Sequence, residues 1–214
     1  LAERSIQRGG QRESMRWRRS AMNRTIIDEL FERYLELGHR SYGEEVTELE
    51  HALQTALLAR EHGEEAPLIA AALLHDCGHL LHDLGEEIAD EGIDAVHEVI
   101  GADLLSAHFP ATVSEPVRFH VAAKRYLCQA EPGYLDGLSA ASQLSLGLQG
   151  GPMTSAEARS FESHPHFQAA VRLRRYDDAA KMVNVATPPL ESFRALLATL
   201  LSDESAPRGG VIRQ

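Results

Sequence analysis

The stretch LLHDCGHLLHDLGEE, Leu73 to Glu87, places three histidines and two aspartates within eleven positions of an otherwise apolar segment. The residues just before His75, LIAAALL, are apolar without interruption and predict a helix that is buried on all sides. Buried imidazole and carboxylate groups are unfavourable unless they are paired or bound to a metal. The segment therefore predicts that His75, Asp76 and His79 meet a compensating partner inside the protein.

Around this segment, the spacing of apolar residues indicates an all-α fold. They recur every three or four positions, and no convincing alternating strand pattern of five or more residues appears. Thr47 followed by Glu50 is typical of a capping box, and Pro67 of a first helical turn. The expected helices cover about 25–37, 47–63, 67–76, 93–107, 115–128, 135–148, 155–162, 166–183 and 189–201.

The length of 214 residues fits one domain, which we place at residues 25–202. Residues 1–24 contain seven arginines, two glutamates and few apolar residues, so we expect a disordered arm there. Other interpretations of this arm are an organelle transit peptide, a phosphate-binding tail, or translated sequence upstream of a start at Met15 or Met22. Residues 203–214 predict a flexible C-terminal tail.

Charge and composition exclude some classes of partner. The net charge of −11 disfavours nucleic-acid binding, because contacts to phosphates depend on clustered Lys and Arg. No window of about 18 apolar residues is present, so we expect no membrane-spanning helix. Cys77 and Cys128 lie in apolar helical surroundings, which predicts reduced thiols and a cytoplasmic protein. The sequence leaves the oligomeric state open.

Side chains that can bind metal are scattered over several of the expected helices. Adjacent residues on a helix diverge by about 100°, so His75 and Asp76 serve one ion only near a helix end. A carboxylate of Asp76 that bridges two ions explains the adjacency better. Taken singly, each histidine is more often a core or surface residue with ordinary partners; as a set they favour a metal centre of iron, manganese or zinc. The set is His51, His75, Asp76, His79, His97, His120 and Asp177.

The two lysines give an independent indication. Arginine fills nineteen of the twenty-one basic positions, and only Lys124 and Lys181 are lysine. Each lies four residues after a ligand-capable residue, His120 or Asp177, and so shares a helix face with it. This placement favours an anionic substrate beside a metal, and Arg174 would add a bidentate contact. The alternative is chance placement on solvated faces.

Five segments, taken together and in order, resemble the HD-domain mixed-valent diiron oxygenases of phosphonate catabolism, which are distant relatives of myo-inositol oxygenase. They are YGEEVTELEHALQ (42–54), AALLHDCGHLL (71–81), HVAAKRYL (120–127), LSAASQLSLGLQGGP (138–152) and LRRYDDAAK (173–181). The resemblance runs from about Tyr42 to Lys181 and implies an HD-domain helical bundle with a buried dinuclear metal site.

What the resemblance implies about the metal site can be stated residue by residue. One iron would be bound by His51, His75, Asp76 and Asp177, and the other by Asp76, His97 and His120, with Asp76 bridging. Asp177 is preferred to Asp178 because its spacing to Lys181 matches the family. The substrate-binding positions would be Glu44, His79, Lys124, Ser142 and Arg174, with Ser145, Gln149 and Lys181 as further contributors.

Tyr42 matches a tyrosine that occupies an open iron position in the family. Its spacing to Glu44 is two residues here, whereas the family has three. Glu44 itself matches a carboxylate that pairs with the amino or quaternary ammonium group of the substrate.

The function implied by the resemblance is a dioxygenase reaction on a small anionic organophosphonate. A mixed-valent Fe(II)/Fe(III) pair and O₂ would cleave the carbon–phosphorus bond of a 1-hydroxy-2-aminoethylphosphonate-type substrate. The products would be phosphate and glycine or glycine betaine. A competing interpretation is a metal-dependent HD-type phosphohydrolase of a nucleotide or other phosphate ester, and a third is a helical metal or ligand sensor without turnover.

Overall fold

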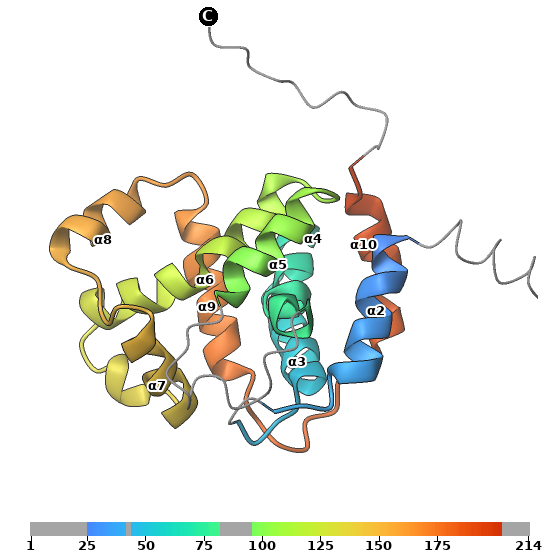
Figure 1. Ribbon diagram of the computed structural model, residues 1–214, viewed down its shortest axis with the longest axis horizontal. Coiled ribbons are helices and arrows are strands. Elements are labelled where there is room, and N and C mark those ends of the chain that lie inside the picture. The colour runs from blue at the N-terminus through green and yellow to red at the C-terminus, as the bar shows by residue number, and fades with distance from the viewer. Residues whose placement is uncertain (1–24, 42–43, 82–95, 203–214) are drawn as a thin grey trace, which may run out of the picture.

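The computed structural model describes residues 25–41, 44–81 and 96–202. The expectations for the arm 1–24, the tail 203–214 and Tyr42 lie outside the described residues. All regular elements in the described ranges are helices, so the all-α prediction is confirmed (Figure 1). They are α2 (Ile26–Leu37), α3 (Glu48–Glu61), α4 (Ala66–Leu74), η1 (Cys77–Leu81), α5 (His97–Ser106), α6 (Ala111–Ala130), η2 (Leu135–Gly137), α7 (Ala140–Leu148), α8 (Ser155–Glu162), α9 (Phe167–Ala179), η3 (Leu190–Phe193) and α10 (Arg194–Leu200).

Helix α4 occupies the centre of the bundle. Its apolar residues are buried all round, and it packs against α3, α6, α9 and α10. Figure 1 shows α2 and α10 side by side at one end of the molecule and α7 and α8 at the other. A second, smaller apolar cluster joins α6, α8 and α9 around Phe161 and Phe167. Helices α6 and α9 take part in both clusters and so connect them.

Local sequence signals set several of the helix starts. Capping boxes open α2 at Thr25, α3 at Thr47 and α8 at Thr154, each with an acidic residue three positions later. Inside the core, the hydroxyl of Tyr34 donates to the carbonyl of Leu73 over 2.8 Å. This hydrogen bond ties α2 to the last turn of α4, immediately before His75.

Several predicted helix boundaries are wrong. The helix predicted over 67–76 ends at Leu74, so His75 and Asp76 lie just beyond its last turn. The helix predicted over 166–183 ends at Ala179, and Lys181 therefore lies in the following loop rather than on a shared face with Asp177. The predicted 135–148 and 189–201 segments each divide into a 3₁₀ turn and an α-helix. Helix α6 begins at Ala111, four residues before the predicted start, and contains Pro116 in its interior.

Two glycines allow η1 and α5 to approach closely. A Cβ atom added to Gly78 would lie 2.0 Å from the backbone carbonyl oxygen of His97. One added to Gly101 would lie 3.2 Å from the Cys77 sulfur and 3.2 Å from the Gly78 nitrogen. Glycine, which has no Cβ atom, permits this contact. The contact places His97 beside Asp76.

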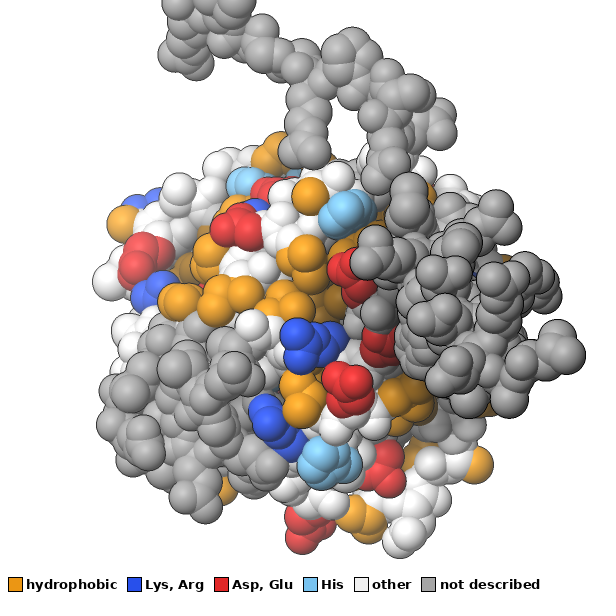
Figure 2. Space-filling view, turned by 45° about the vertical axis from the view of Figure 1, so that its right-hand side comes forward, with side chains coloured by type: hydrophobic (Ala, Val, Ile, Leu, Met, Phe, Trp, Pro, Cys, Tyr) orange, Lys and Arg blue, Asp and Glu red, His pale blue; other side chains and the backbone are white. Residues whose placement is uncertain are grey.

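The surface and the helix lengths bear on the expected partners. The face in Figure 2 shows Lys and Arg side chains next to Asp and Glu side chains, without an extended basic patch on the part that is described. Within the described ranges, no helix combines the length and apolarity that a membrane crossing requires.

Candidate metal centre

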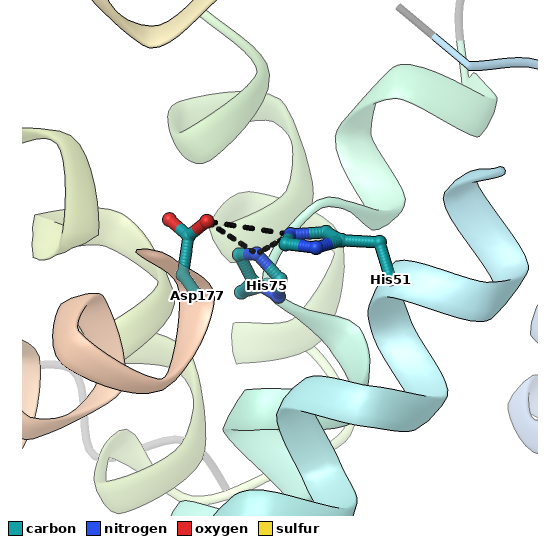
Figure 3. A group of neighbouring side chains, drawn as sticks. All are labelled: His51, His75 and Asp177. Carbon is teal, nitrogen blue, oxygen red and sulfur yellow. Dashed lines mark hydrogen bonds and ion pairs between the residues drawn. The ribbon is translucent and has the colours of Figure 1, made fainter. Parts of the chain in front are cut away.

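Three of the expected ligands meet from three separate elements. His51 projects from α3, His75 follows α4, and Asp177 comes from the last turns of α9, as Figure 3 shows. The Nε2 atoms of His51 and His75 are 3.1 Å apart, and Oδ1 of Asp177 lies 3.3 Å from Nε2 of His51. All three side chains are buried. Their ligand atoms lie within 4.8 Å of one another, a spacing that one cation can span.

A second group lies next to the first. Nε2 of His97 on α5 is 3.1 Å from Nε2 of His120 on α6. Oδ1 of Asp76 is 3.3 Å from the former and 3.4 Å from the latter. This group is also compact enough for one cation.

Asp76 connects the two groups through its two oxygen atoms. Oδ2 lies 3.2 Å from Nε2 of His75 and 3.6 Å from Nε2 of His51, whereas Oδ1 faces His97 and His120. This is the geometry expected of a carboxylate that bridges two ions. Because His75 and Asp76 lie past the end of α4, their side chains can also both reach the same group.

Backbone carbonyls orient most of the imidazole rings. Nδ1 lies 3.0 Å from the carbonyl of Ala180 in His51, 3.0 Å from that of Ala72 in His75, and 2.7 Å from that of Val117 in His120. These contacts assign the proton to Nδ1 and direct the Nε2 lone pair to the site. Nδ1 of His97 faces the carboxylate of Glu98 at 3.6 Å.

These ring orientations test whether the site fits a metal. If His51 and His75 are both neutral, each Nδ1 donates to a carbonyl, and the two Nε2 atoms face each other as acceptors at 3.1 Å. Two facing lone pairs repel unless a proton or a cation lies between them. Imidazole nitrogens and carboxylate oxygens around such a point suit iron, manganese or zinc, so the residues fit the expected cations.

The charged groups shift one another's pKa values. Burial raises the pKa of the Asp76 carboxyl, but in the metal-free site protons on the imidazoles of His75, His120 and His97 supply charge and hydrogen bonds that bring that pKa well below its usual range. Burial likewise raises the pKa of Asp177, but the charge of Arg174 together with contributions from His51, His75 and Lys181 brings that pKa well below its usual range. Both carboxylates are therefore ionised at neutral pH and available to cations.

Basic and hydroxyl side chains gather beside the ligands. Nζ of the buried Lys124 donates to Oγ of Ser145 over 2.8 Å. Oγ of Ser142 receives hydrogen bonds from Lys181 at 3.0 Å and from Arg174 at 3.4 Å. The predicted anion-binding residues on α6, α7 and α9 thus converge, together with Lys181 in the loop after α9.

Glu44 lies at the same place but already has partners. Its Oε1 accepts from Nζ of Lys181 over 2.5 Å and from Oγ of Ser139 over 2.7 Å. A substrate cation that binds Glu44 must therefore compete with this lysine.

Asp177 and Asp178 are adjacent but have different neighbours. Asp177 faces His51 through Oδ1 and accepts from Nη1 of Arg174 over 2.7 Å through Oδ2. Asp178 instead accepts hydrogen bonds from Nη2 of Arg174 and from the hydroxyl of Tyr134. The structure thus brings Asp177, the residue preferred from the sequence, to the histidines.

The remaining predicted site residues differ in their placement. His79 stacks on His97 with ring centroids 4.0 Å apart. Gln149 caps the end of α7, and its side-chain oxygen is buried with no hydrogen-bond partner in the described part of the chain. Tyr42 is outside the described residues.

Sequence reasoning missed three polar residues at the site. Glu48 lies three residues before His51, a helical spacing that could have identified it. Tyr134 and Ser139 follow the turn EPG, and no spacing in the sequence connects them to the ligands.

Comparisons with known proteins agree on one family. The HD domain family model matches residues 49–158, just over half of the chain. The chain is 44% identical over 176 residues to hydroxymethylphosphonate dioxygenase of Gimesia maris, covering 82% of this chain and 88% of that protein. It is also 40% identical over 165 residues to the glycine-betaine-forming [1-hydroxy-2-(trimethylamino)ethyl]phosphonate dioxygenase of Leisingera caerulea, covering 77% of this chain and 84% of the relative.

Proposed function

The chain is an enzyme that belongs to the HD-domain oxygenases of phosphonate catabolism, and we propose on this premise that it uses two iron ions to cleave a carbon–phosphorus bond. The proposed substrate is a 1-hydroxy-2-aminoethylphosphonate with a primary amino or trimethylammonio group. With O₂ as the second substrate, the products are phosphate, a proton, and glycine or glycine betaine. The observation that carries this proposal is Asp76, whose two oxygens face two separate histidine groups.

The two ligand groups support one proposed position for each ion. One iron would be held by His51, His75, Asp76 and Asp177, and the other by Asp76, His97 and His120. When bound, the pair supplies Lewis-acid polarisation of the substrate hydroxyl and the electrons that activate dioxygen. The carbonyl contacts of the histidines keep their Nε2 atoms aimed at the ions before substrate arrives.

The basic side chains are suited to hold the phosphonate. Lys124 and Arg174 are buried, so their charges act on an anion with little screening by water. Ser142 lies between Arg174 and Lys181 and can add a hydroxyl donor. Together these groups would fix the orientation of the phosphonate and offset its charge as the phosphorus–carbon bond breaks.

Glu44 is the proposed contact for the substrate cation. Its carboxylate lies at the edge of the same group of basic residues, where the far end of a two-carbon phosphonate would reach. The two relatives act, by their names, on a phosphonate without an amine and on one with a trimethylated amine. The Glu44–Lys181 pair is therefore the place where we expect selection among such substrates.

The experiment compares substrates with and without oxygen. Protein loaded anaerobically with iron would be offered 1-hydroxy-2-aminoethylphosphonate, its trimethylammonio analogue and hydroxymethylphosphonate, and phosphate would be measured by a colorimetric assay. We expect phosphate release only when O₂ is admitted, together with an Fe(II)Fe(III) electron paramagnetic resonance signal that changes on substrate addition. Release under strict anaerobiosis would identify a hydrolase instead, and faster turnover of hydroxymethylphosphonate would overturn the proposed substrate.

A further inference from the structure

Glu48 is a buried carboxylate that the proposed ligand set does not use. It is the first residue of α3 and lies one turn before His51. Only 7% of its surface is exposed, and its Oε2 has no hydrogen-bond partner among the residues that the structure describes. An unpartnered buried carboxylate is unfavourable unless a cation or a donor compensates it.

The start of α3 does not account for this burial. The capping box is completed by the exposed Glu50, whose carboxylate accepts from the backbone nitrogen and hydroxyl of Thr47 over 2.9 and 3.0 Å. The backbone of Glu48 is held separately, since its nitrogen donates to the carbonyl of Arg40 over 2.7 Å. The Glu48 side chain therefore takes no part in the capping box of α3.

The surroundings of Glu48 point to a cation. Ligand atoms of Glu48, Asp76 and His79 lie within 4.8 Å of one another. His79 stacks on His97 at 4.0 Å, so this group adjoins the second histidine group. Glu48 thus borders the bridging carboxylate rather than an isolated part of the surface.

The two proposed ion positions differ in their number of protein ligands. Among the residues that the structure describes, four side chains surround the first, namely His51, His75, Asp76 and Asp177, whereas three surround the second, namely Asp76, His97 and His120. We propose that Glu48 is a further carboxylate ligand of the metal centre, where it joins Asp76 and His79 around a cation. This inference rests on the metal-binding part of the proposed function and is independent of the oxygen chemistry.

The substitution Glu48→Gln removes the charge and keeps the shape. Glu61→Gln is the matched control, because Glu61 is exposed at the other end of the same helix. Metal-free proteins would be titrated with Co²⁺ by calorimetry and visible absorption. We expect Glu48→Gln to bind two Co²⁺ per chain, with the weaker site weakened by about tenfold or more and its absorption bands shifted. Glu61→Gln should titrate like the unsubstituted protein.

Thermal unfolding separates a ligand from a packing residue. Glu48→Gln should leave the melting temperature of the metal-free protein unchanged or raised, because it removes a buried carboxyl group whose Oε2 has no partner among the described residues. It should reduce the rise in melting temperature that Co²⁺ produces, and Glu48→Asp should restore part of that rise. A lowered melting temperature without metal, with both Co²⁺ affinities reduced alike, would identify a packing residue and overturn the proposal.

Unchanged affinity at both sites in Glu48→Gln would overturn it as well. These outcomes are distinct from failure of the proposed function. Absence of phosphate release from every phosphonate would remove the oxygenase proposal, yet the Co²⁺ titrations would still decide the role of Glu48.

Discussion

The proposed metal ligands and the proposed anion-binding residues are neighbours, but they are held in different ways. Three ligand histidines are oriented by backbone carbonyls, those of Ala180, Ala72 and Val117. The anion-binding side chains are instead held by other side chains, and Arg174 alone contacts Asp177, Asp178, Ser142 and Tyr134. The first region is held by contacts to the backbone, whereas the second is held by ion pairs and hydrogen bonds among its own side chains.

This difference has a consequence for binding. A cation entering the ligand groups finds nitrogen lone pairs already directed at it, so little reorganisation is needed. A phosphonate entering the basic group must draw Lys181 or Arg174 partly away from carboxylates that already pair with them. We therefore expect substitutions in the first region to abolish metal binding and those in the second to alter substrate affinity.

The largest effect is expected for Asp76→Ala. Because both of its oxygens face histidine groups, its loss should remove most bound iron and lower phosphate release by about 1000-fold, equivalent to about 4 kcal/mol. Iron content by elemental analysis and the rate of phosphate release are the measurements. Asp136→Ala, in the exposed turn η2, is the control and should retain both. Normal iron content in Asp76→Ala would refute the bridging role.

Gly78→Ala is expected to affect the scaffold of the first region. The new methyl group would lie 2.0 Å from the carbonyl oxygen of His97, so η1 and α5 must separate. Overpacking of this kind costs about 1–3 kcal/mol of unfolding free energy. Chemical denaturation measures this loss of stability. Gly147→Ala is the control, because Gly147 is an exposed position of α7 and no atom lies within 4 Å of a Cβ added there. Equal stability of the two variants would show that the contact is not tight.

The pH dependence should report on Lys124 in the second region. Burial, with the nearby charge of Arg174, lowers the pKa of Lys124 to about 8. Above that pH the free enzyme loses a positive charge that the phosphonate needs, so kcat/KM should fall about tenfold per pH unit. Bound phosphonate favours the charged form of Lys124, so kcat should begin to fall only at a higher pH than kcat/KM does. Lys124→Arg, which stays charged, should lack the limb near pH 8, and persistence of that limb would assign it to another group.

The smallest effect is expected for Glu44→Gln, and its sign should depend on the substrate. Loss of the carboxylate frees Lys181, so hydroxymethylphosphonate should bind several-fold more tightly. A substrate with an ammonium group should bind about fivefold more weakly, equivalent to about 1 kcal/mol. KM values for the two substrate types measure this split, and Glu45→Gln, at the exposed neighbouring position, is the control. A shift of both KM values in the same direction would exclude Glu44 from cation recognition.

The sequence was most informative where a local pattern coincides with a contact. The helical class and the capping boxes follow from short-range spacing, and the ligand candidates follow from polar residues within apolar helices. Family resemblance then favoured Asp177 over Asp178, which composition cannot distinguish; in the structure Asp177 faces His51, whereas Asp178 pairs with Arg174.

What the sequence did not give depends on tertiary contacts. The apolar run LIAAALL is followed by HDC, with no proline or glycine next to Leu74, so nothing local predicts that α4 ends at Leu74. The end of α4 coincides with a tertiary contact, in which Gly78 packs against the backbone of His97. Likewise, Tyr134 reaches Arg174 across forty positions of sequence, a distance that no periodicity encodes.

The close contact between η1 and α5 also encloses the thiol of Cys77, which is fully buried. Burial, with the charge of Asp76, raises the pKa of this thiol to about 12, so the reactive thiolate is scarce at neutral pH. An alkylating reagent can reach Cys77 only after η1 separates from α5. Cys128, which is partly exposed, serves as an internal reference. The rate of Cys77 alkylation, measured against that of Cys128, therefore reports how often η1 separates from α5.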